Sequence, residues 1–267
     1  MSRSIKAIIL AAGEGSRLRP YTSDRPKCLV ELGGKPLIVH QIDVLSKIGI
    51  DEINIVAGYL ADKVENLGYR TFLNPAYAAT NMVSSLMCAD ELLDGKTDIL
   101  ITYGDIVYEV KVIQALLACR APICTSIDKD WQRLWQIRFE DLLKNAETLK
   151  LDNSKNILEV GKKPENLEEI EGQYMGLIKL SAEFAPRLVK AYQNLNPEAL
   201  YDGKNLPNMF MTSFLQYLVD SGLPVKAVTV SGGWLEIDTA KDLELYNRMY
   251  KKGALSDYCR ILYDENG

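Results

Sequence analysis

A continuous apolar segment begins near the N-terminus and passes directly into glycines. Residues 5–11 read IKAIILA, and Gly13 and Gly15 follow within four positions. An apolar run without alternation is typical of a strand buried on both faces of a parallel sheet. Glycines after such a strand let backbone N–H groups approach phosphate without an intervening Cβ atom. The segment therefore predicts an α/β fold with a nucleotide site at the carboxyl ends of the strands.

Strands and amphipathic helices alternate through the first half of the chain. The predicted strands are residues 5–11, 52–57, 70–74, 98–103 and 122–127, and the helices between them are 35–49, 61–67, 82–93 and 110–118. This alternation at crossover spacing is typical of an open, mostly parallel sheet. We therefore expect a Rossmann-like twisted sheet flanked by helices.

The second half has a different pattern, beginning near Trp131. Residues 131–147 are rich in charge and aromatic side chains, and a hairpin is predicted around the turn at 153–156. The remaining elements are predicted as strands at 174–180, 225–230 and 234–237 and helices at 182–195, 211–221 and 240–250. Since no Pro- or Ser-rich linker interrupts the chain, residues 1–267 are expected to form one domain.

Charge and cysteine content exclude several classes of partner. A net charge of -5 argues against bulk binding to nucleic acid or to an anionic membrane surface. No apolar run is long enough to span a bilayer. The five cysteines include no CxxC pair, so we expect reduced thiols in a cytoplasmic protein.

A dense cationic segment follows the first glycine turn. Its cations and prolines are Arg17, Arg19, Pro20, Arg25, Pro26 and Lys27. The spacing matches neither the dinucleotide fingerprint nor the P-loop. Arg17 and Lys27 could neutralise a triphosphate, one as a planar fork and one as a point charge. The alternative is a solvated cationic loop.

Three carboxylates stand where strands are predicted to end. Asp105 follows the strand at 98–103, and Glu236 and Asp238 precede the last helix. Glu236 and Asp238 are two residues apart, so an extended chain points both to one face. Mg²⁺ prefers such oxygen ligands. The alternatives are a turn or helix-cap aspartate at Asp105 and helix capping at Asp238.

The first of these regions carries a family resemblance. The segment LAAGEGSRLRPYTSDRPKCLVELGGKPLI, residues 10–38, resembles the signature of the sugar-phosphate nucleotidylyltransferase superfamily. The matching pattern is G-x-G-x-R-L-x-P-x-T, then P-K-x-L and K-P-[LM]-[IL]. The resemblance implies that an acceptor oxygen attacks the α-phosphorus of a nucleoside triphosphate and that pyrophosphate leaves.

The resemblance also implies roles for individual residues. Arg17 would hold the β- and γ-phosphates, and Lys27 the α-phosphate and the developing charge. Asp105 and Asp238, with Glu236 beside them, would bind Mg²⁺. Residues 1–128 would form the nucleotide-binding half, and residues 129–267 the acceptor-binding half with the last metal carboxylate. The implied nucleotide-binding residues are Leu10, Ala11, Ala12, Gly13, Glu14, Gly15, Ser16, Gly58, Tyr59, Asn81, Ser84, Ser85 and Tyr103. Ser84 and Ser85 could bind a pyrimidine edge or form ordinary helix surface.

Segments along most of the chain resemble a smaller subgroup. They include NPAYAATNMVSSL, YGDIVYE, DKDWQRLWQIRFED, NAETLKL, GQYMGLIKL and LYDGKNLPNMFMTSFLQ. This subgroup transfers CMP from CTP to phosphocholine, 2-aminoethylphosphonate or a phosphorylated glutamine. A small phospho- or phosphono-acceptor is therefore expected, in phosphonate, phosphocholine or cell-surface polysaccharide metabolism. The acceptor, a strict preference for CTP over UTP, and a homodimer all remain open.

Side chains that suit a small zwitterion are concentrated in the second half. The candidate acceptor-binding residues are Asp128, Trp131, Trp135, Arg138, Glu147, Lys162, Tyr174, Gly176 and Trp234. Aromatic faces attract ammonium groups, and an arginine could bind a carboxylate, although tryptophans are as often core residues. Two other functions remain: a sugar-1-phosphate uridylyl- or thymidylyltransferase, and a non-catalytic nucleotide-binding paralogue.

Overall fold

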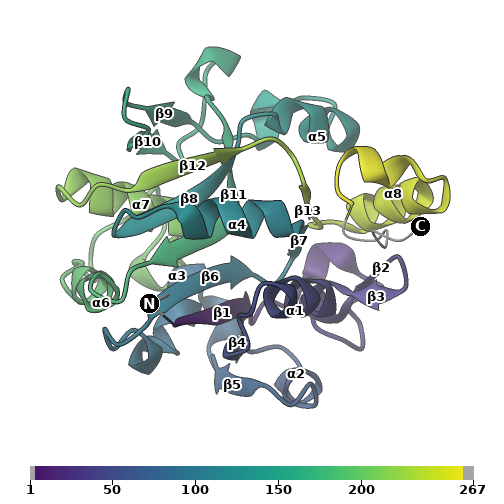
Figure 1. The fold of residues 1–267 in the computed structure, drawn as a ribbon, viewed down its shortest axis with the longest axis horizontal. Helices are drawn as coiled ribbons and strands as arrows, with labels where there is room; N and C mark the ends of the chain where they lie inside the picture. The colour runs from purple at the N-terminus through teal and green to yellow at the C-terminus, as the bar shows by residue number, and fades with distance from the viewer. Residues whose placement is uncertain (1–3, 261–267) are drawn as a thin grey trace.

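The computed structural model describes residues 4–260, and a twisted seven-stranded sheet forms its centre (Figure 1). The strand order is β12-β8-β11-β6-β1-β4-β5. The strands are β1 (Ile5–Ala11), β4 (Ile53–Ala57), β5 (Arg70–Leu73), β6 (Asp98–Tyr103), β8 (Ile123–Asp128), β11 (Gln173–Leu180) and β12 (Lys226–Val230). Only β11 runs antiparallel to its neighbours in this sheet. The predicted mostly parallel α/β fold is therefore confirmed.

Helices cover both faces of the sheet (Figure 1). They are α1 (Leu37–Lys47), α2 (Ala61–Glu65), α3 (Met82–Met87), α4 (Val110–Ala118), α5 (Trp131–Arg138), α6 (Ala185–Gln193), α7 (Met211–Asp220) and α8 (Ala240–Lys251). One core layer joins α1, α4, α5 and α8 to the sheet, and the other joins α3, α6 and α7. Along β1, Ala7 and Ile9 enter the first layer, whereas Ile8 and Leu10 enter the second. Because alternate residues of β1 enter core layers on opposite faces of the sheet, every buried position of this strand is apolar.

Some element boundaries differ from those predicted. The helix expected over residues 35–49 begins at Leu37, because Lys35 and Pro36 form strand β3 (Lys35–Pro36) against β2 (Glu31–Leu32). The helix expected over 82–93 ends at Met87 and gives way to a 3₁₀ turn at Asp90–Leu92. There Cys88 and Ala89 donate their backbone N–H groups three residues back, which tightens the last turn.

A short two-stranded sheet brings distant carboxylates together. Strand β13 (Trp234–Glu236) pairs antiparallel with β7 (Ile106–Tyr108), a strand that the sequence pattern did not predict. The backbone N–H of Ile237 then donates to the carbonyl of Asp105 at 3.0 Å. The turn after β6 therefore lies beside the segment that leads into α8. The predicted hairpin is also present, as β9 (Leu149–Leu151) and β10 (Ile157–Val160).

The expectation of five reduced thiols is wrong for one pair. Cys119 and Cys124 form a disulfide. Helix α4 ends at Ala118 and strand β8 begins at Ile123, so the short loop between them brings the two Cα atoms to 6.8 Å. Within residues 4–260, no helix is long and apolar enough to cross a membrane.

Candidate active site

The glycine turn after β1 positions the first cation of the site. Gly15 has φ +69°, and a Cβ atom built there would lie 2.8 Å from the Lys27 Cβ. Thr22 fixes the turn by donating its hydroxyl to the Gly15 carbonyl at 2.9 Å. A side chain at position 15 would therefore be strained and would displace Lys27.

Lys27 lies between two aspartates from different parts of the chain. Its Nζ is 2.7 Å from Asp105 Oδ2 and 2.8 Å from Asp238 Oδ1. Burial alone would lower the pKa of this amine, but the two carboxylates outweigh burial and raise the pKa above its ordinary value. Lys27 therefore stays protonated at neutral pH. Arg17, which is largely exposed, adds a second cation with its Nη2 3.0 Å from Asp238 Oδ1.

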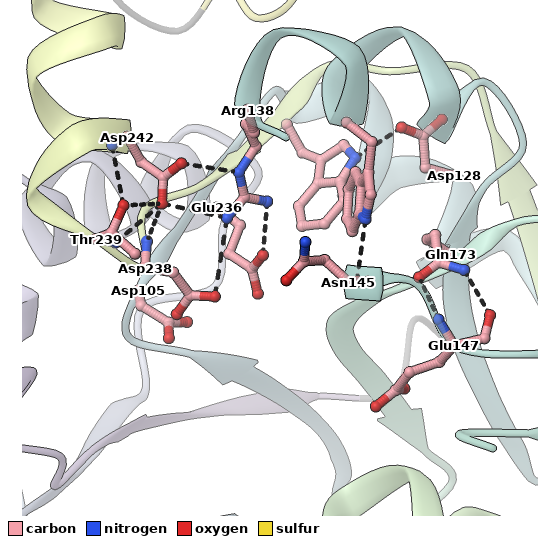
Figure 2. Close-up of polar contacts among 12 residues, drawn as sticks. Asp105, Asp128, Arg138, Asn145, Glu147, Gln173, Glu236, Asp238, Thr239 and Asp242 are labelled. Atoms are coloured by element: carbon pink, nitrogen blue, oxygen red, sulfur yellow. Dashed lines mark hydrogen bonds and ion pairs between the residues drawn. The ribbon is translucent and has the colours of Figure 1, made fainter. Parts of the chain in front are cut away.

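The carboxylates around Lys27 have unequal pKa values. Burial raises the pKa of Asp238, but the charge of Lys27 and its hydrogen bond more than offset this, so the pKa lies below its ordinary value. Burial and then the negative charge of Asp238 raise the pKa of Glu236 to about 7. Arg138 Nη1 donates to Glu236 Oε2 at 2.7 Å and opposes that rise (Figure 2).

The donor chemistry of Asp105 and Asp238 fits a magnesium ion. Asp105 Oδ1 is buried and has no hydrogen-bond partner, so one carboxylate oxygen remains able to accept a ligand. Within residues 4–260, no three or more His, Cys, Asp or Glu side chains are grouped to hold a metal by themselves. Mg²⁺ is commonly held by one or two carboxylates together with substrate phosphates, and two aspartates satisfy that requirement.

A cavity of about 530 Å³ extends from these carboxylates toward the second half of the chain. Of the predicted acceptor-binding residues, Trp135, Glu147 and Tyr174 line it, together with Arg17, Asp105 and Asp238. The predicted site residues did not include eight further lining residues: Met82, Phe139, Asn145, Gln173, Phe210, Met211, Thr212 and Thr239. Most of them lie within the segments that carry the subgroup resemblance, which was the available signal.

The structure places Asp128, Trp131 and Trp234 outside this cavity. Both tryptophans are 2% exposed. Asp128 Oδ2 accepts a hydrogen bond from Trp234 Nε1 at 2.8 Å, and Asp128 Oδ1 accepts from the N–H of Gly232 at 3.0 Å. Both carboxylate oxygens are therefore occupied within the protein. The expected cluster of three acceptor-binding tryptophans is reduced to Trp135, against which the other two pack.

Three other acceptor candidates also lie away from the cavity lining. Lys162 is exposed and pairs with Glu159 at 3.2 Å. Gly176 has φ +77°, and a Cβ atom there would lie 2.9 Å from the Tyr103 ring. The role of this glycine is therefore to leave room for the Tyr103 ring. Arg138 directs its guanidinium to Glu236 and Asp242.

The nucleotide-side candidates divide into two groups. The turn at Gly58 and Tyr59 packs against the end of β1, where the Tyr59 N–H donates to the Ala12 carbonyl at 3.0 Å. The second group makes internal hydrogen bonds. Ser84 Oγ donates to the Pro207 carbonyl at 2.9 Å, and Ser85 Oγ accepts from Asn74. The side chain of Asn81 accepts from Met82 N at the start of α3.

The chain is similar in sequence to known nucleotidyltransferases. Residues 7–163 match the model of the MobA-like NTP transferase domain. The chain is 43% identical over 250 residues to a CTP:phosphoglutamine cytidylyltransferase of Campylobacter jejuni, covering 90% of this chain and 98% of that protein. It is 46% identical over 93 residues to a choline-phosphate cytidylyltransferase of Streptococcus pneumoniae, covering 33% of this chain and 41% of that protein.

Solved structures share the fold. CTP:phosphocholine cytidylyltransferase from Streptococcus pneumoniae superposes with a TM-score of 0.67 at 23% identity, covering 92% of this chain and 99% of that structure. The inositol-1-phosphate CTP transferase from T. maritima gives 0.69 at 20% identity, covering 94% and 98%. The family model spans more than half of the chain, and the predicted enzyme class is confirmed. The chain is a nucleotidyltransferase that belongs to the MobA-like NTP transferase domain family.

Proposed function

We propose that this protein is a Mg²⁺-dependent cytidylyltransferase that transfers CMP from CTP to phosphoglutamine or a closely related small phospho-acceptor. The observation that carries the proposal is the 43% identity to a phosphoglutamine cytidylyltransferase over 98% of that protein's length. Similarity to choline-phosphate cytidylyltransferase and to a synthase of CMP-5'-(3-aminopropyl)phosphonate supports the same reaction class.

The proposed reaction needs no general base, because the attacking acceptor oxygen is already an anion. That oxygen forms a bond to the α-phosphorus of CTP, and the bond from the α-phosphorus to the bridging oxygen of pyrophosphate breaks. Pyrophosphate then leaves with the electron pair of that bond. Catalysis therefore depends on positioning and on neutralising the phosphate charges.

The residues around Lys27 suit these two requirements. The protonated amine of Lys27 would bind the α-phosphate, and Arg17 would bind the outer phosphates from its exposed position. Asp105 and Asp238 would hold Mg²⁺. When bound, the ion would neutralise phosphate charge and fix the orientation of the triphosphate.

The cavity suits an acceptor that carries an amino group. Glu147 lies across the cavity from Asp105 and Asp238 (Figure 2). Trp135 and Tyr174 also line the cavity, and aromatic side chains attract ammonium groups. The acceptor phosphate would therefore lie near Lys27, and its amino group near Glu147.

The test is a pyrophosphate-release assay over a matrix of substrates. The nucleotides are CTP, UTP, dTTP and GTP, and the acceptors are phosphoglutamine, phosphocholine, 2-aminoethylphosphonate and glucose-1-phosphate. We expect kcat/KM to be highest for CTP with phosphoglutamine. Release with hexose-1-phosphates alone would replace the proposal by a sugar-1-phosphate nucleotidyltransferase. Nucleotide binding without release in any combination would indicate a regulatory paralogue.

A further inference from the structure

The guanidinium of Arg138 is buried beside the carboxylates but does not line the cavity. Its side chain is 0% exposed, and its Cζ lies 5.2 Å from the Trp135 ring centroid and 4.8 Å from that of Phe139. Both aromatic residues line the acceptor cavity. Arg138 therefore lies behind the cavity wall, where it cannot bind an acceptor carboxylate directly.

The hydrogen bonds of this guanidinium go to two carboxylates, Glu236 just before α8 and Asp242 in the first turn of α8. Nη1 donates to Glu236 at 2.7 Å. Nε and Nη2 donate to the two oxygens of Asp242 at 3.1 and 3.4 Å. A planar fork can hold two carboxylates in fixed relative positions in a way that a single ammonium group cannot.

The Asp242 carboxylate connects Arg138 to the backbone of Asp238. Its Oδ2 accepts from the backbone N–H groups of Asp238 at 3.1 Å and Thr239 at 2.9 Å. Thr239 and Asp242 also form the capping box of α8. Because Arg138 fixes the Asp242 carboxylate and that carboxylate fixes the Asp238 backbone, the three residues form one connected unit.

The side chain of Asp238 remains able to bind a ligand in this arrangement. Arg138 Nη2 lies 3.8 Å from Asp238 Oδ2, which permits charge attraction but is too long for a hydrogen bond. The arginine therefore attracts the carboxylate without occupying its lone pairs.

We propose that Arg138 is a positioning residue, which holds Asp238 at the geometry that the metal–CTP complex needs and ties it to the wall of the acceptor cavity. The inference rests on the proposed role of Asp238 in holding the metal. It assigns Arg138 to the alignment of the reaction centre and not to acceptor recognition.

The main test is Arg138→Lys, which keeps the positive charge but loses the fork. We expect kcat to fall about 10–100-fold, as for residues that hold metal ligands in place. The affinity for Mn²⁺ in the presence of CTP, measured by electron paramagnetic resonance without acceptor, should fall about tenfold. The KM for the acceptor should stay within about threefold of wild type, because uniform acceptor binding is unaffected.

A second variant tests the proposal even if Arg138→Lys does not fold. In Asp242→Asn, the amide oxygen can still accept from Thr239, so the helix cap is retained. The amide NH₂ then faces Arg138 in place of a carboxylate oxygen, which breaks the arginine contact. We expect the same loss of Mn²⁺ affinity, and the two substitutions together should cost less than the product of their separate effects.

Arg133→Lys is the matched control. Arg133 lies on the same helix and is exposed, with its guanidinium 4.8 Å from the ring centroid of Tyr258. Its substitution should change neither Mn²⁺ affinity nor kcat.

The proposal is overturned if Arg138→Lys and Asp242→Asn bind Mn²⁺ as wild type does, or if only the acceptor KM changes. A lower melting temperature with unchanged kinetics in the folded fraction would also overturn it. If wild type turns over no acceptor, the proposed function fails, whereas the Mn²⁺ comparison still decides the role of Arg138.

Discussion

The ammonium nitrogen of Lys27 lies 2.7 Å from the carboxylate oxygen Oδ2 of Asp105, although the two residues are 78 positions apart in sequence. The lysine follows the glycine turn after β1, and the aspartate follows β6, which is the neighbouring strand of the sheet. Because parallel strands deliver their carboxyl ends to one edge, a cation and an anion from separate loops meet there. The relationship gives Lys27 a fixed position and a fixed charge.

Lys27→Met should abolish most turnover. Removal of the ammonium group leaves no cation between Asp105 and Asp238, so kcat should fall about 10²–10³-fold, as when one preorganised donor is removed. Arg17 and Arg138 still face Asp238, so we expect the variant to fold. Pyrophosphate release and thermal melting check the two parts, with Lys96→Met, an exposed lysine paired with Asp94, as the control. Near-normal kcat would remove Lys27 from the mechanism.

Asp105→Asn should make the enzyme insensitive to added metal. The substitution keeps the shape of the side chain but removes the charge that a divalent cation needs, so metal-dependent kcat should fall by at least about 10²-fold. Wild-type activity should disappear in EDTA and return with Mg²⁺. Asp94→Asn is the surface control. Full Mg²⁺-dependent turnover by Asp105→Asn would show that the ion, if required, binds elsewhere.

Substitutions of Trp135 and of Trp131 should have different effects. Trp135→Phe reduces the aromatic face that lines the cavity and should raise the acceptor KM several-fold, about 1 kcal/mol of binding. Trp131→Phe alters a residue that packs behind it, so it should lower the melting temperature and leave the acceptor KM unchanged. Initial rates over a range of acceptor concentrations, with melting curves, distinguish the two. Equal changes in KM would contradict the placement of Trp131 outside the cavity.

Glu147 should make stability depend on pH in a defined direction. Burial raises its pKa above the ordinary value of 4.5, with Asp202 adding to the rise and Thr212 opposing it by a hydrogen bond. The folded state therefore binds this proton more tightly than the unfolded state, and stability is lost as pH rises through the raised pKa.

Glu147→Gln removes that loss. Its melting temperature should exceed that of wild type at pH 8, and the difference should shrink as the pH falls toward 4. The same substitution should raise the KM for phosphoglutamine, since it removes the countercharge proposed for the amino group. A melting temperature below that of wild type at pH 8 would show that the Glu147 charge is stabilised by the fold.

Local signals were enough to predict the sheet and the convergence of the main charged residues. β1, β6 and α4 have the predicted bounds, because their apolar periods are unbroken and a turn or cap ends each one. Lys27 and Asp105 each follow a strand of the parallel sheet. The rule that parallel strands end at one edge of the sheet is therefore enough to predict that these two side chains lie close together.

Side-chain partners across the two halves could not be predicted in the same way. Trp131 and Trp135 are four residues apart on one helix, yet only Trp135 lines the cavity, whereas Trp131 is 2% exposed and packs edge-on against the Trp135 ring. Arg138 lies 98 and 104 positions from Glu236 and Asp242, and no local pattern links them.

The shortest elements could not be predicted from the periodicity of apolar residues either. Strand β7 has three residues, too few to show an alternation, yet it aligns β13 and the segment that ends in Asp238.

Ser84 has the residue type of a base-reading group, but the carbonyl of Pro207 accepts its hydroxyl hydrogen.

The ion pair between Lys27 and Asp238 spans 211 positions, which has a consequence during synthesis of the protein. A growing chain presents Lys27 and Asp105 long before the ribosome has added Asp238. Until that residue and α8 follow, the cationic loop has only one of its two aspartates, and the reaction centre is incomplete. Chains that still lack Asp238 should therefore consume no nucleoside triphosphate, so transfer begins only after Asp238 and α8 have been made.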